Sequence, residues 1–435
     1  MRYFGYVPSV IGLMIFALSA VFYSKYDKLY MHLMRSISLI PYSVPFIDSQ
    51  FMYDMKKCWL AGIDIYVSVP CDIVPGNRFA YSPLWPRLPF LPADRSFTYP
   101  VAIATDLAAI MSVALLPRAK DYREAAFVSL TLVSPSVVFA LERNNIDVWF
   151  YLASCAVVLL AWRDGPGRFI GYGVIVFAGL LKYYPFCWLI MAVRERLSTL
   201  VLVVTASALA VSAFVWALLP EIERGLANLP VTPVLRRGIS ACDLPSAIGM
   251  LTDGSPDFGW LRAASLLAIV SFVGVAGVRR GLRPEFRALI AETPDRTLRW
   301  LVTGSVTISF CYFVAFNEAY RGIYLLLIVP SLLAIRREKA GAQFRDLFEY
   351  LPVVAVGLLW APNLEDVVLT SFSLLVGSPA VGMTVYIALW AVEKLVWAWF
   401  VSVLVSVLVA WSMDMPATRE VFATLRPPVW RRKAL

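Results

Sequence analysis

The sequence predicts an all-α polytopic membrane protein whose helices cross or re-enter the bilayer roughly 10–13 times. Of its 435 residues, 60% are hydrophobic and only 16% are charged, whereas a soluble domain carries about 25% charged residues. Apolar runs of the length that crosses the hydrocarbon, about 20 residues, recur along the chain. Short basic clusters separate these runs, as they do on the cytoplasmic side of membrane proteins.

The first apolar run, 7–23, follows Arg2 and contains no small-residue cleavage site, which predicts a retained anchor rather than a signal peptide. A long hydrophilic loop, about 24–97, comes next. The further runs lie at about 98–117, 124–141, 146–162, 169–193, 197–219, 260–278, 299–316, 321–335, 348–361 and 377–412. We interpret residues 1–412 as one polytopic domain and residues 413–435 as a basic cytoplasmic tail.

Charge predicts the orientation of these runs. The basic residues gather in six places: 118–123, 163–168, 194–196, 279–299, 336–345 and 431–433. The positive-inside rule assigns all six to the cytoplasm. The outer segments are then 24–97, 142–145, 220–259, 317–320 and 362–376.

Two runs do not fit a simple alternation. Run 169–193 begins and ends at cytoplasmic clusters, and Lys182-Tyr183-Tyr184-Pro185 places a charge and a helix breaker in its middle. We expect two short helices with a turn near the outer surface, lining a cavity. The run 377–412 is too long for one simple span and is interrupted by Glu393-Lys394. The basic tail favours an odd number of crossings there, and the exact number stays open.

The net charge of +9 does not indicate a nucleic-acid partner, because the basic residues sit between spans. The six cysteines form no CxxC pair and the chain has one histidine, so we expect no zinc site or other metal, and no cofactor. Cys58 and Cys71 fall in the same outer loop, and the sequence is compatible with a disulfide or with two free thiols. Asp106, in the second run, either pairs with another helix or contacts a cavity.

Several polar residues are predicted to converge on the outer face. A charge at membrane depth costs about 2.5–3.5 kcal/mol, so such residues usually mark a site. The cations are Arg143, Lys182 and Arg321, and an anionic phosphate suits them because Arg binds it through a planar fork and Lys as a point charge. Asp48 and Glu142 supply carboxylates on the same face.

Each of these residues also has a plainer interpretation. Glu142 and Arg143 fit an interfacial ion pair, Lys182 fits a side chain that snorkels to the interface, and Arg321 fits an interfacial anchor. Asp48 taken alone fits a solvated loop. Their shared sidedness favours the site.

These stretches resemble glycosyltransferase family 87, the domain-of-unknown-function 2029 family, within the type-C glycosyltransferases that use polyprenyl-phosphate sugars. The matching stretches, within about 40–335, are Asp48 followed by Gly62-Ile63-Asp64-Ile65-Tyr66, then Phe79-Ala80-Tyr81-Ser82-Pro83, Glu142-Arg143-Asn144-Asn145-Ile146-Asp147, Lys182-Tyr183-Tyr184-Pro185, and Asn317 with Tyr320-Arg321. The chain departs from the family pattern at Ile65 and Ser82, where Pro is usual, and at Asn144, where Gly is usual. The histidine pair of the mannosyltransferase members is missing, so the donor sugar stays open.

The resemblance implies an inverting transfer at the outer face of a bacterial inner membrane, from a polyprenyl-phosphate sugar to a glycan or glycolipid. Asp48 would be the general base, and Arg143, Lys182 and Arg321 would stabilise the leaving phosphate. Residues expected to bind substrate are Tyr53, Asp64, Tyr66, Tyr81, Glu142, Asn145, Tyr183, Asn317 and Tyr320. No Asp-x-Asp occurs, which fits a monophosphate donor without a metal.

Two other functions compete with this one. A flippase or transporter of lipid-linked glycans usually shows repeats and midplane ion sites, whereas the polar residues here gather toward one face. A polysaccharide polymerase or ligase would use a later outer loop, and the segment 220–259, with Arg224, Arg236, Arg237 and Asp243, keeps that function open.

Overall fold

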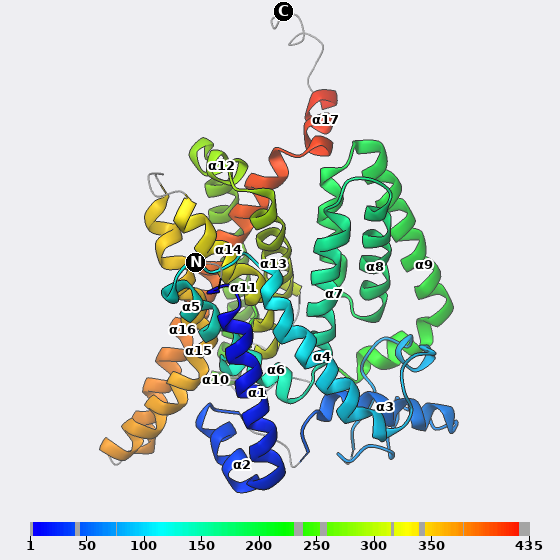
Figure 1. The fold of residues 1–435 in the computed structure, drawn as a ribbon, viewed down its shortest axis with the longest axis vertical. Helices are drawn as coiled ribbons and strands as arrows, with labels where there is room; N and C mark the ends of the chain where they lie inside the picture. The colour runs from blue at the N-terminus through cyan, green and yellow to red at the C-terminus, as the bar shows by residue number, and fades with distance from the viewer. Residues whose placement is uncertain are drawn as a thin grey trace, which may run out of the picture.

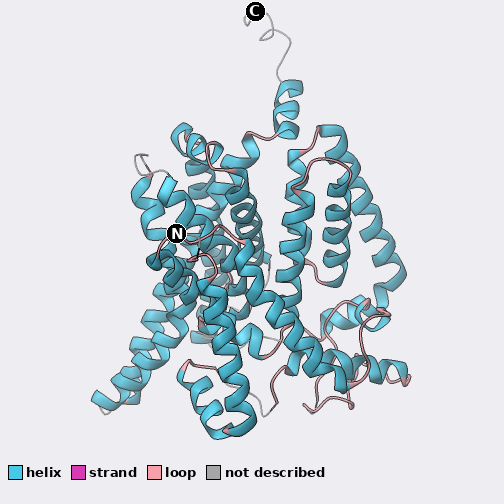
Figure 2. Ribbon diagram, in the orientation of Figure 1, coloured by secondary structure: helices cyan, strands magenta, loops and turns pink. Residues whose placement is uncertain are grey.

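The computed structural model describes residues 3–39, 44–74, 76–229, 238–252, 259–314, 317–338, 344–376 and 378–425. Within these ranges the chain forms helices joined by loops (Figure 1, Figure 2), and its single β pairing is an isolated bridge between Gly238 and Glu318. The predicted all-α class is therefore confirmed.

Eight helices of the described ranges are long and apolar enough to cross a membrane, or nine if the bent pair α5–α6 counts as one span. The spans are α1 (Val7–Lys25), α4 (Thr98–Ser112), α9 (Leu197–Ala227), α11 (Gly259–Gly281), α13 (Asp295–Val314), α14 (Leu325–Glu338) with the turn η6 (Ala319–Tyr324), α15 (Arg345–Val376) and α16 (Pro379–Met413). The bent pair is α5 (Tyr122–Leu132) and α6 (Pro135–Glu142), and three shorter apolar helices are α7 (Ile146–Ala161), α8 (Gly167–Leu181) and η4 (Tyr184–Arg194). The chain is a polytopic membrane protein.

The centre of the bundle is formed by α13 and by α14 with η6. Buried residues make up 78% and 89% of their apolar stretches, whereas they make up 11% in both α9 and α11. Since apolar side chains on α9 and α11 face outward, these helices present the surface expected to contact lipid.

The predicted cytoplasmic clusters share one end of the bundle, which we call the basic end. Ion pairs join turns that are far apart in sequence: Arg168 with Glu195 (3.1 Å), Arg337 with Glu124 (2.6 Å), Arg194 with Asp295 (3.9 Å) and Arg287 with Asp414 (2.5 Å). Helix α12 (Pro284–Ala291) contacts α16, and α17 (Pro416–Leu425) contacts the start of α9. Lys339 and the tail's Arg431, Arg432 and Lys433 lie outside the described residues.

The run 169–193 forms two helices that leave and return to the basic end, as predicted. The 15 residues of α8 rise about 22 Å, and the 11 residues of η4, a 3₁₀ helix, rise about the same distance. The two pack closely, because a Cβ on Gly179 would lie 2.6 Å from the Phe186 ring. The break between them is Lys182-Tyr183, where Lys182 has an extended backbone.

The hairpin α15–α16 corrects one prediction. Residues 362–376, expected as an outer loop, continue α15, and 377–412 is traversed by one helix of 35 residues, α16. A 35-residue helix is about 52 Å long, well beyond the hydrocarbon thickness of about 30 Å. The apolar pattern ends near Pro362, but packing against α16 carries α15 further. One crossing agrees with the odd number that the tail favoured.

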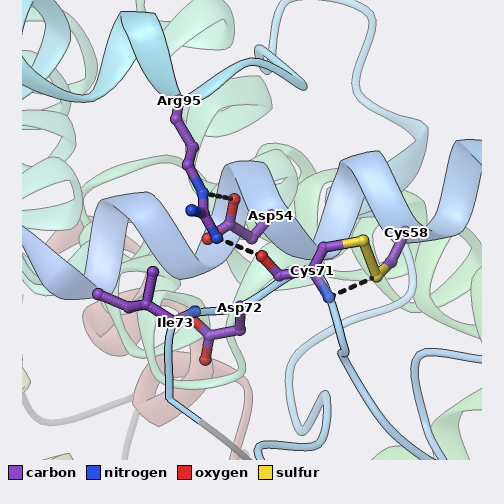
Figure 3. The surroundings of a disulfide bond; sticks show 6 residues. All are labelled: Asp54, Cys58, Cys71, Asp72, Ile73 and Arg95. Atoms are coloured by element: carbon purple, nitrogen blue, oxygen red, sulfur yellow. Dashed lines mark hydrogen bonds and ion pairs between the residues drawn. A yellow bond between two sulfur atoms is a disulfide. The ribbon is translucent and has the colours of Figure 1, made fainter.

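The loop 24–97 is more ordered than a hydrophilic loop. It contains α2 (Asp27–Ser36), α3 (Ile47–Leu60) and the short turns η1 (Trp85–Arg87) and η2 (Arg95–Phe97), and a Cys58–Cys71 disulfide joins α3 to the following segment. Figure 3 shows Arg95 beside this disulfide, bonded to Asp54 (2.6 Å) and to the Cys71 carbonyl. Burial raises the pKa of Asp54, and the Arg95 guanidinium opposes that shift.

The end of α9 supports this loop. Leu218 has a non-helical backbone next to Pro220, so the helix bends there. Beyond the bend, Arg224 pairs with Asp64 at 2.7 Å and Glu221 with Arg87 at 2.6 Å. These contacts hold the loop against the end of the bundle opposite the basic end, which we call the site end.

Candidate active site

The turn between α6 and α7 organises the site end. Asn144 has a φ of 41°, in the left-handed region that Asn tolerates better than most side chains. Asn145 then caps α7 by accepting a hydrogen bond from the Asp147 backbone N–H at 3.0 Å. The left-handed residue lets the chain reverse between the two helices.

Asp48, in the first turn of α3, is held by this turn. Arg143 donates from Nε (3.0 Å) and Nη2 (2.7 Å) to Oδ1, and Asn145 donates from Nδ2 to Oδ2 at 2.5 Å. The Asp48 backbone N–H also donates to the Arg143 carbonyl at 3.2 Å. The Asp48 side chain keeps 19% of its surface exposed, so it is fixed in position but reachable.

A second carboxylate, Asp147, is fully buried in the first turn of α7. Lys182 Nζ lies 2.9 Å from its Oδ1, Arg321 Nε lies 3.7 Å from its Oδ2, and the Tyr184 hydroxyl donates to Oδ1. Tyr184 is in turn bonded to Tyr324 at 2.6 Å. The three cations predicted to bind a phosphate thus divide between two carboxylates: Arg143 contacts Asp48, and the other two contact Asp147.

The predictions did not include Asp147 as a site residue. The sequence carried a signal for it, because two cations at membrane depth need a nearby anion, and Asp147 ends the same motif that supplies Arg143. Tyr184 and Tyr324 were also missed. An isolated tyrosine in an apolar run has no distinguishing pattern, and only the fold brings these two to Asp147.

Tyr81 lies between the two carboxylate clusters. Lys182 Nζ is 6.0 Å from the centre of its ring. Burial raises the pKa of the Tyr81 phenol, Asp48 and Asp147 raise it further, and Arg143 and Arg321 oppose them. Charges from both clusters therefore act on one side chain, and the two clusters form one site. Tyr320 lies beside it, with its ring 6.0 Å from that of Phe139.

The side chain of Asp106, on α4, is hydrogen-bonded to the turn between α6 and α7. It is fully buried, and Asn144 Nδ2 donates to its Oδ1 at 2.7 Å. The same amide group contacts Thr105 Oγ1 at 2.7 Å, while Asn144 Oδ1 accepts from Trp149 at 3.2 Å. Of the two interpretations left open by the sequence, pairing with another part of the chain is therefore the one observed.

Other predicted residues occupy the rim of the site. Tyr53 is fully buried beside Asp48 in a pocket that also contains Trp85 and Trp149. The pocket is small: its empty space, including the part that is open to the surroundings, is about 240 Å³. A sugar phosphate would require this pocket to widen.

Asp64 and Tyr66 are anchored to α9 rather than to Asp48, through Arg224 and a 3.4 Å bond from the Tyr66 hydroxyl to Glu221. A chain of ring contacts nevertheless leads from Tyr66 through Phe79 to Tyr81, with centroids 5.7 and 5.9 Å apart.

The last three predicted residues have different surroundings. Glu142 accepts from Tyr30 at 3.2 Å, and Tyr183 is 42% exposed with its ring 6.4 Å from Phe310. The Asn317 amide donates to the Cys311 carbonyl, so it stabilises the end of α13.

Within the described residues, no group of three or more His, Cys, Asp or Glu side chains is arranged to hold a metal ion. Arg236 and Arg237, on which the polymerase alternative partly depended, lie outside the described residues. Comparison with family models, curated proteins and solved structures finds no match to this chain.

Proposed function

We propose that this protein is a membrane glycosyltransferase that transfers a sugar from a polyprenyl-phosphate donor to a hydroxyl group of a glycan or glycolipid, with inversion. The donor and acceptor would meet at the site end, facing the exterior of a bacterial inner membrane. One observation carries the proposal: the same site contains a fixed, reachable carboxylate and a buried guanidinium whose Nη1 has no hydrogen-bond partner among the described residues.

The carboxylate is Asp48. Each carboxylate oxygen has two lone pairs, and Arg143 occupies both on Oδ1 while Asn145 occupies one on Oδ2. The remaining lone pair of Oδ2 is available to an acceptor hydroxyl. Such a fixed acceptor suits general-base catalysis, in which the hydroxyl proton moves to Asp48 as its oxygen attacks the anomeric carbon.

The guanidinium is that of Arg321, which is 6% exposed. Its Nη1 is buried and has no hydrogen-bond partner among the described residues, and an unsatisfied buried donor is unfavourable by about 1–3 kcal/mol or more. A phosphate oxygen would satisfy it. Lys182, 8% exposed in its side chain, would add a second positive charge. As the bond between the anomeric carbon and the phosphate oxygen breaks, both cations would stabilise the charge left on the lipid phosphate.

The test is transfer of labelled sugar from a polyprenyl phosphate, by purified protein, to a panel of glycan and glycolipid acceptors. Asp48→Asn keeps the shape and the Asn145 contact region but removes the base, so we expect about a 10²–10⁴-fold loss of kcat. Asp27→Asn, at an exposed aspartate of the same outer loop, is the matched control and retains full activity.

Full activity of Asp48→Asn would remove the general-base role. Movement of the intact lipid-linked sugar across vesicles, without transfer, would favour the flippase instead.

A further inference from the structure

A large apolar chamber lies beside the site, between α1, α4, α5 and α6. Its empty space, including the part that is open to the surroundings, is about 880 Å³. Side chains such as Phe16, Ile103 and Leu141 form its walls, and α2 and Phe46 close it toward the site end. Neither Asp48 nor Asp147 is among the residues that line this chamber.

The chamber exists because α1 and α4 touch at one end and separate toward the other. Near the basic end, Ser9 Oγ donates to the Ile110 carbonyl at 3.1 Å, and Gly12 allows close packing, since a Cβ there would lie 2.9 Å from Ile110. At the other end, only the hydroxyl groups of Tyr23 and Tyr99 approach, at 3.5 Å.

The chamber is as long as one leaflet of the bilayer and opens to lipid. From Gly12 to Tyr23, α1 rises about 16 Å, roughly half the hydrocarbon thickness. Ile15 on α1 and Ile103 on α4 line the chamber and are each 38% exposed on the outside of the protein. A hydrocarbon chain can therefore enter sideways from the membrane.

Polar groups occur at the mouth of the chamber, near the site end. Tyr23, Tyr30, Tyr99 and Glu142 supply three hydroxyls and one carboxylate, and no Lys or Arg is among the described residues that line the chamber. Burial and the Glu142 carboxylate raise the pKa of the Tyr30 phenol, so it stays a hydrogen-bond donor. This mouth offers a phosphate no cation, and its hydroxyl groups suit a neutral head group with several hydroxyls.

The mouth is directly connected to Asp48. The Phe46 backbone N–H donates to the Glu142 carbonyl at 2.8 Å, and that of Asp48 donates to the Arg143 carbonyl at 3.2 Å. Adjacent residues of one turn thus line the mouth and hold the base. A head group bound at Glu142 would have its hydroxyls beside Asp48.

Resting on the proposed function, we infer that this chamber binds the hydrocarbon chain of the acceptor, which is a glycolipid with an uncharged, polyhydroxylated head. The donor phosphate would instead bind at Lys182 and Arg321. The position of the cations thereby separates the two lipids, because Lys182 and Arg321 lie at the phosphate site and no described residue that lines the chamber is a Lys or Arg.

Photolabelling tests the inference on the full-length protein in nanodiscs. A monoglucosyl diacylglycerol with a diazirine in its acyl chain should label peptides of α1 and α4. Ile103→Trp fills the chamber and should lower that labelling at least about fivefold, whereas Leu209→Trp, on the exposed surface of α9, should leave it unchanged. Ser19→Phe fills the chamber from the α1 side if the first variant folds poorly.

Competition by unlabelled lipids against the photoprobe shows which lipid the chamber binds. Unlabelled glucosyl diacylglycerol should abolish labelling and polyprenyl phosphate should not. Equal competition by polyprenyl phosphate, or equal labelling by a phosphatidylglycerol probe, would overturn the inference, as would no labelling of either helix. Because labelling needs no transfer, it should persist in Asp48→Asn, so a failure of the proposed chemistry is seen separately from a failure of the chamber.

Discussion

Two buried charge clusters among the described residues differ in how completely their polar groups are bonded. In the first, around Asp147, the guanidinium of Arg321 keeps Nη1 without a partner in the described residues. In the second, Lys394 on α16 contacts the Gly238 carbonyl (2.7 Å), Glu393 (2.7 Å) and Asp243 (3.6 Å). No buried side-chain atom of Lys394, Glu393 or Asp243 is without a hydrogen-bond partner in the described residues, whereas Nη1 of Arg321 is.

This difference suggests that the Asp147 cluster binds a ligand and that the Lys394 cluster stabilises the fold. The Lys394 cluster joins α16 to the segment before α10 (Asp243–Leu251), and the neighbouring Ile239 donates to the Asn317 carbonyl at 2.8 Å. It therefore supports the turn that precedes Arg321. Both clusters are buried, but the first holds two cations and one carboxylate, whereas the second holds one cation and two carboxylates. The first therefore has an excess of positive charge as well as the donor at Arg321 that has no partner among the described residues.

The largest effect that we expect is a loss of folding stability when the ion pairs of Lys394 are removed. Lys394→Met leaves Asp243 and Glu393 buried without a cation, and removal of one partner from a buried ion pair destabilises by about 3–5 kcal/mol. Thermal unfolding in detergent, followed by circular dichroism, measures the loss. Equal stability of Lys394→Met and wild type would show that the cluster is not structural.

At the Asp147 cluster we expect a large loss of activity and a small loss of stability. Arg321→Gln should lower the rate of transfer by about 10²–10³-fold, as removal of one donor from a developing charge does, with a smaller loss of stability because Asp147 keeps Lys182 and Tyr184. The measurement compares the transfer rates and the unfolding temperatures of Arg321→Gln and Lys394→Met. A large loss of stability with unchanged transfer would make Arg321 structural, like Lys394.

The pH dependence of stability sharpens the comparison at Asp243. Burial raises the pKa of this carboxyl to about 6, above its ordinary value of 3.8. A raised carboxyl pKa stabilises the fold below the unfolded pKa, and that contribution is lost as pH rises through 6. The wild-type unfolding temperature should therefore fall from pH 4 to pH 7 more than that of Asp243→Asn. Parallel profiles would contradict the assignment.

The smallest expected effect concerns the turn that holds Asp48. Asn144→Gly and Asn144→Ala both lose the bond to Asp106, but only Gly accepts a φ of 41° without strain. The Ala variant should be less stable than the Gly variant by about 1–2 kcal/mol. Denaturant titration of the two variants measures the difference, and equal stabilities would indicate that the turn relaxes.

The fold class and much of the arrangement along the chain could be predicted. Apolar runs and basic clusters predicted the spans and the return of α8 and η4 to one end, because hydrocarbon thickness and charge sidedness act on local sequence. The helices of the first loop and the extension of α15 past Pro362 were not predicted. They depend on packing of α2 against α1, of α3 against α4 and of α15 against α16, which no local pattern reports.

At the site, residue types predicted a polar cluster but not its pairing. We expected one group of cations, formed by Arg143, Lys182 and Arg321. In the structure, Arg143 pairs with Asp48, and the other two pair with Asp147. Which carboxylate meets which cation depends on how α3, α7 and η6 meet. Those contacts join residues up to about 170 positions apart along the printed sequence, a separation at which spacing carries no information.

By itself, the sequence determined that the chain is a helical polytopic membrane protein and that its charges gather toward one side, because burial of charge in hydrocarbon is costly wherever it occurs. Only the tertiary structure decided which buried charges are satisfied. Hydrogen bonding is directional and short in range, so the open donor of Arg321, the contacts of Lys394 and the chamber between α1 and α4 exist only once the helices are packed.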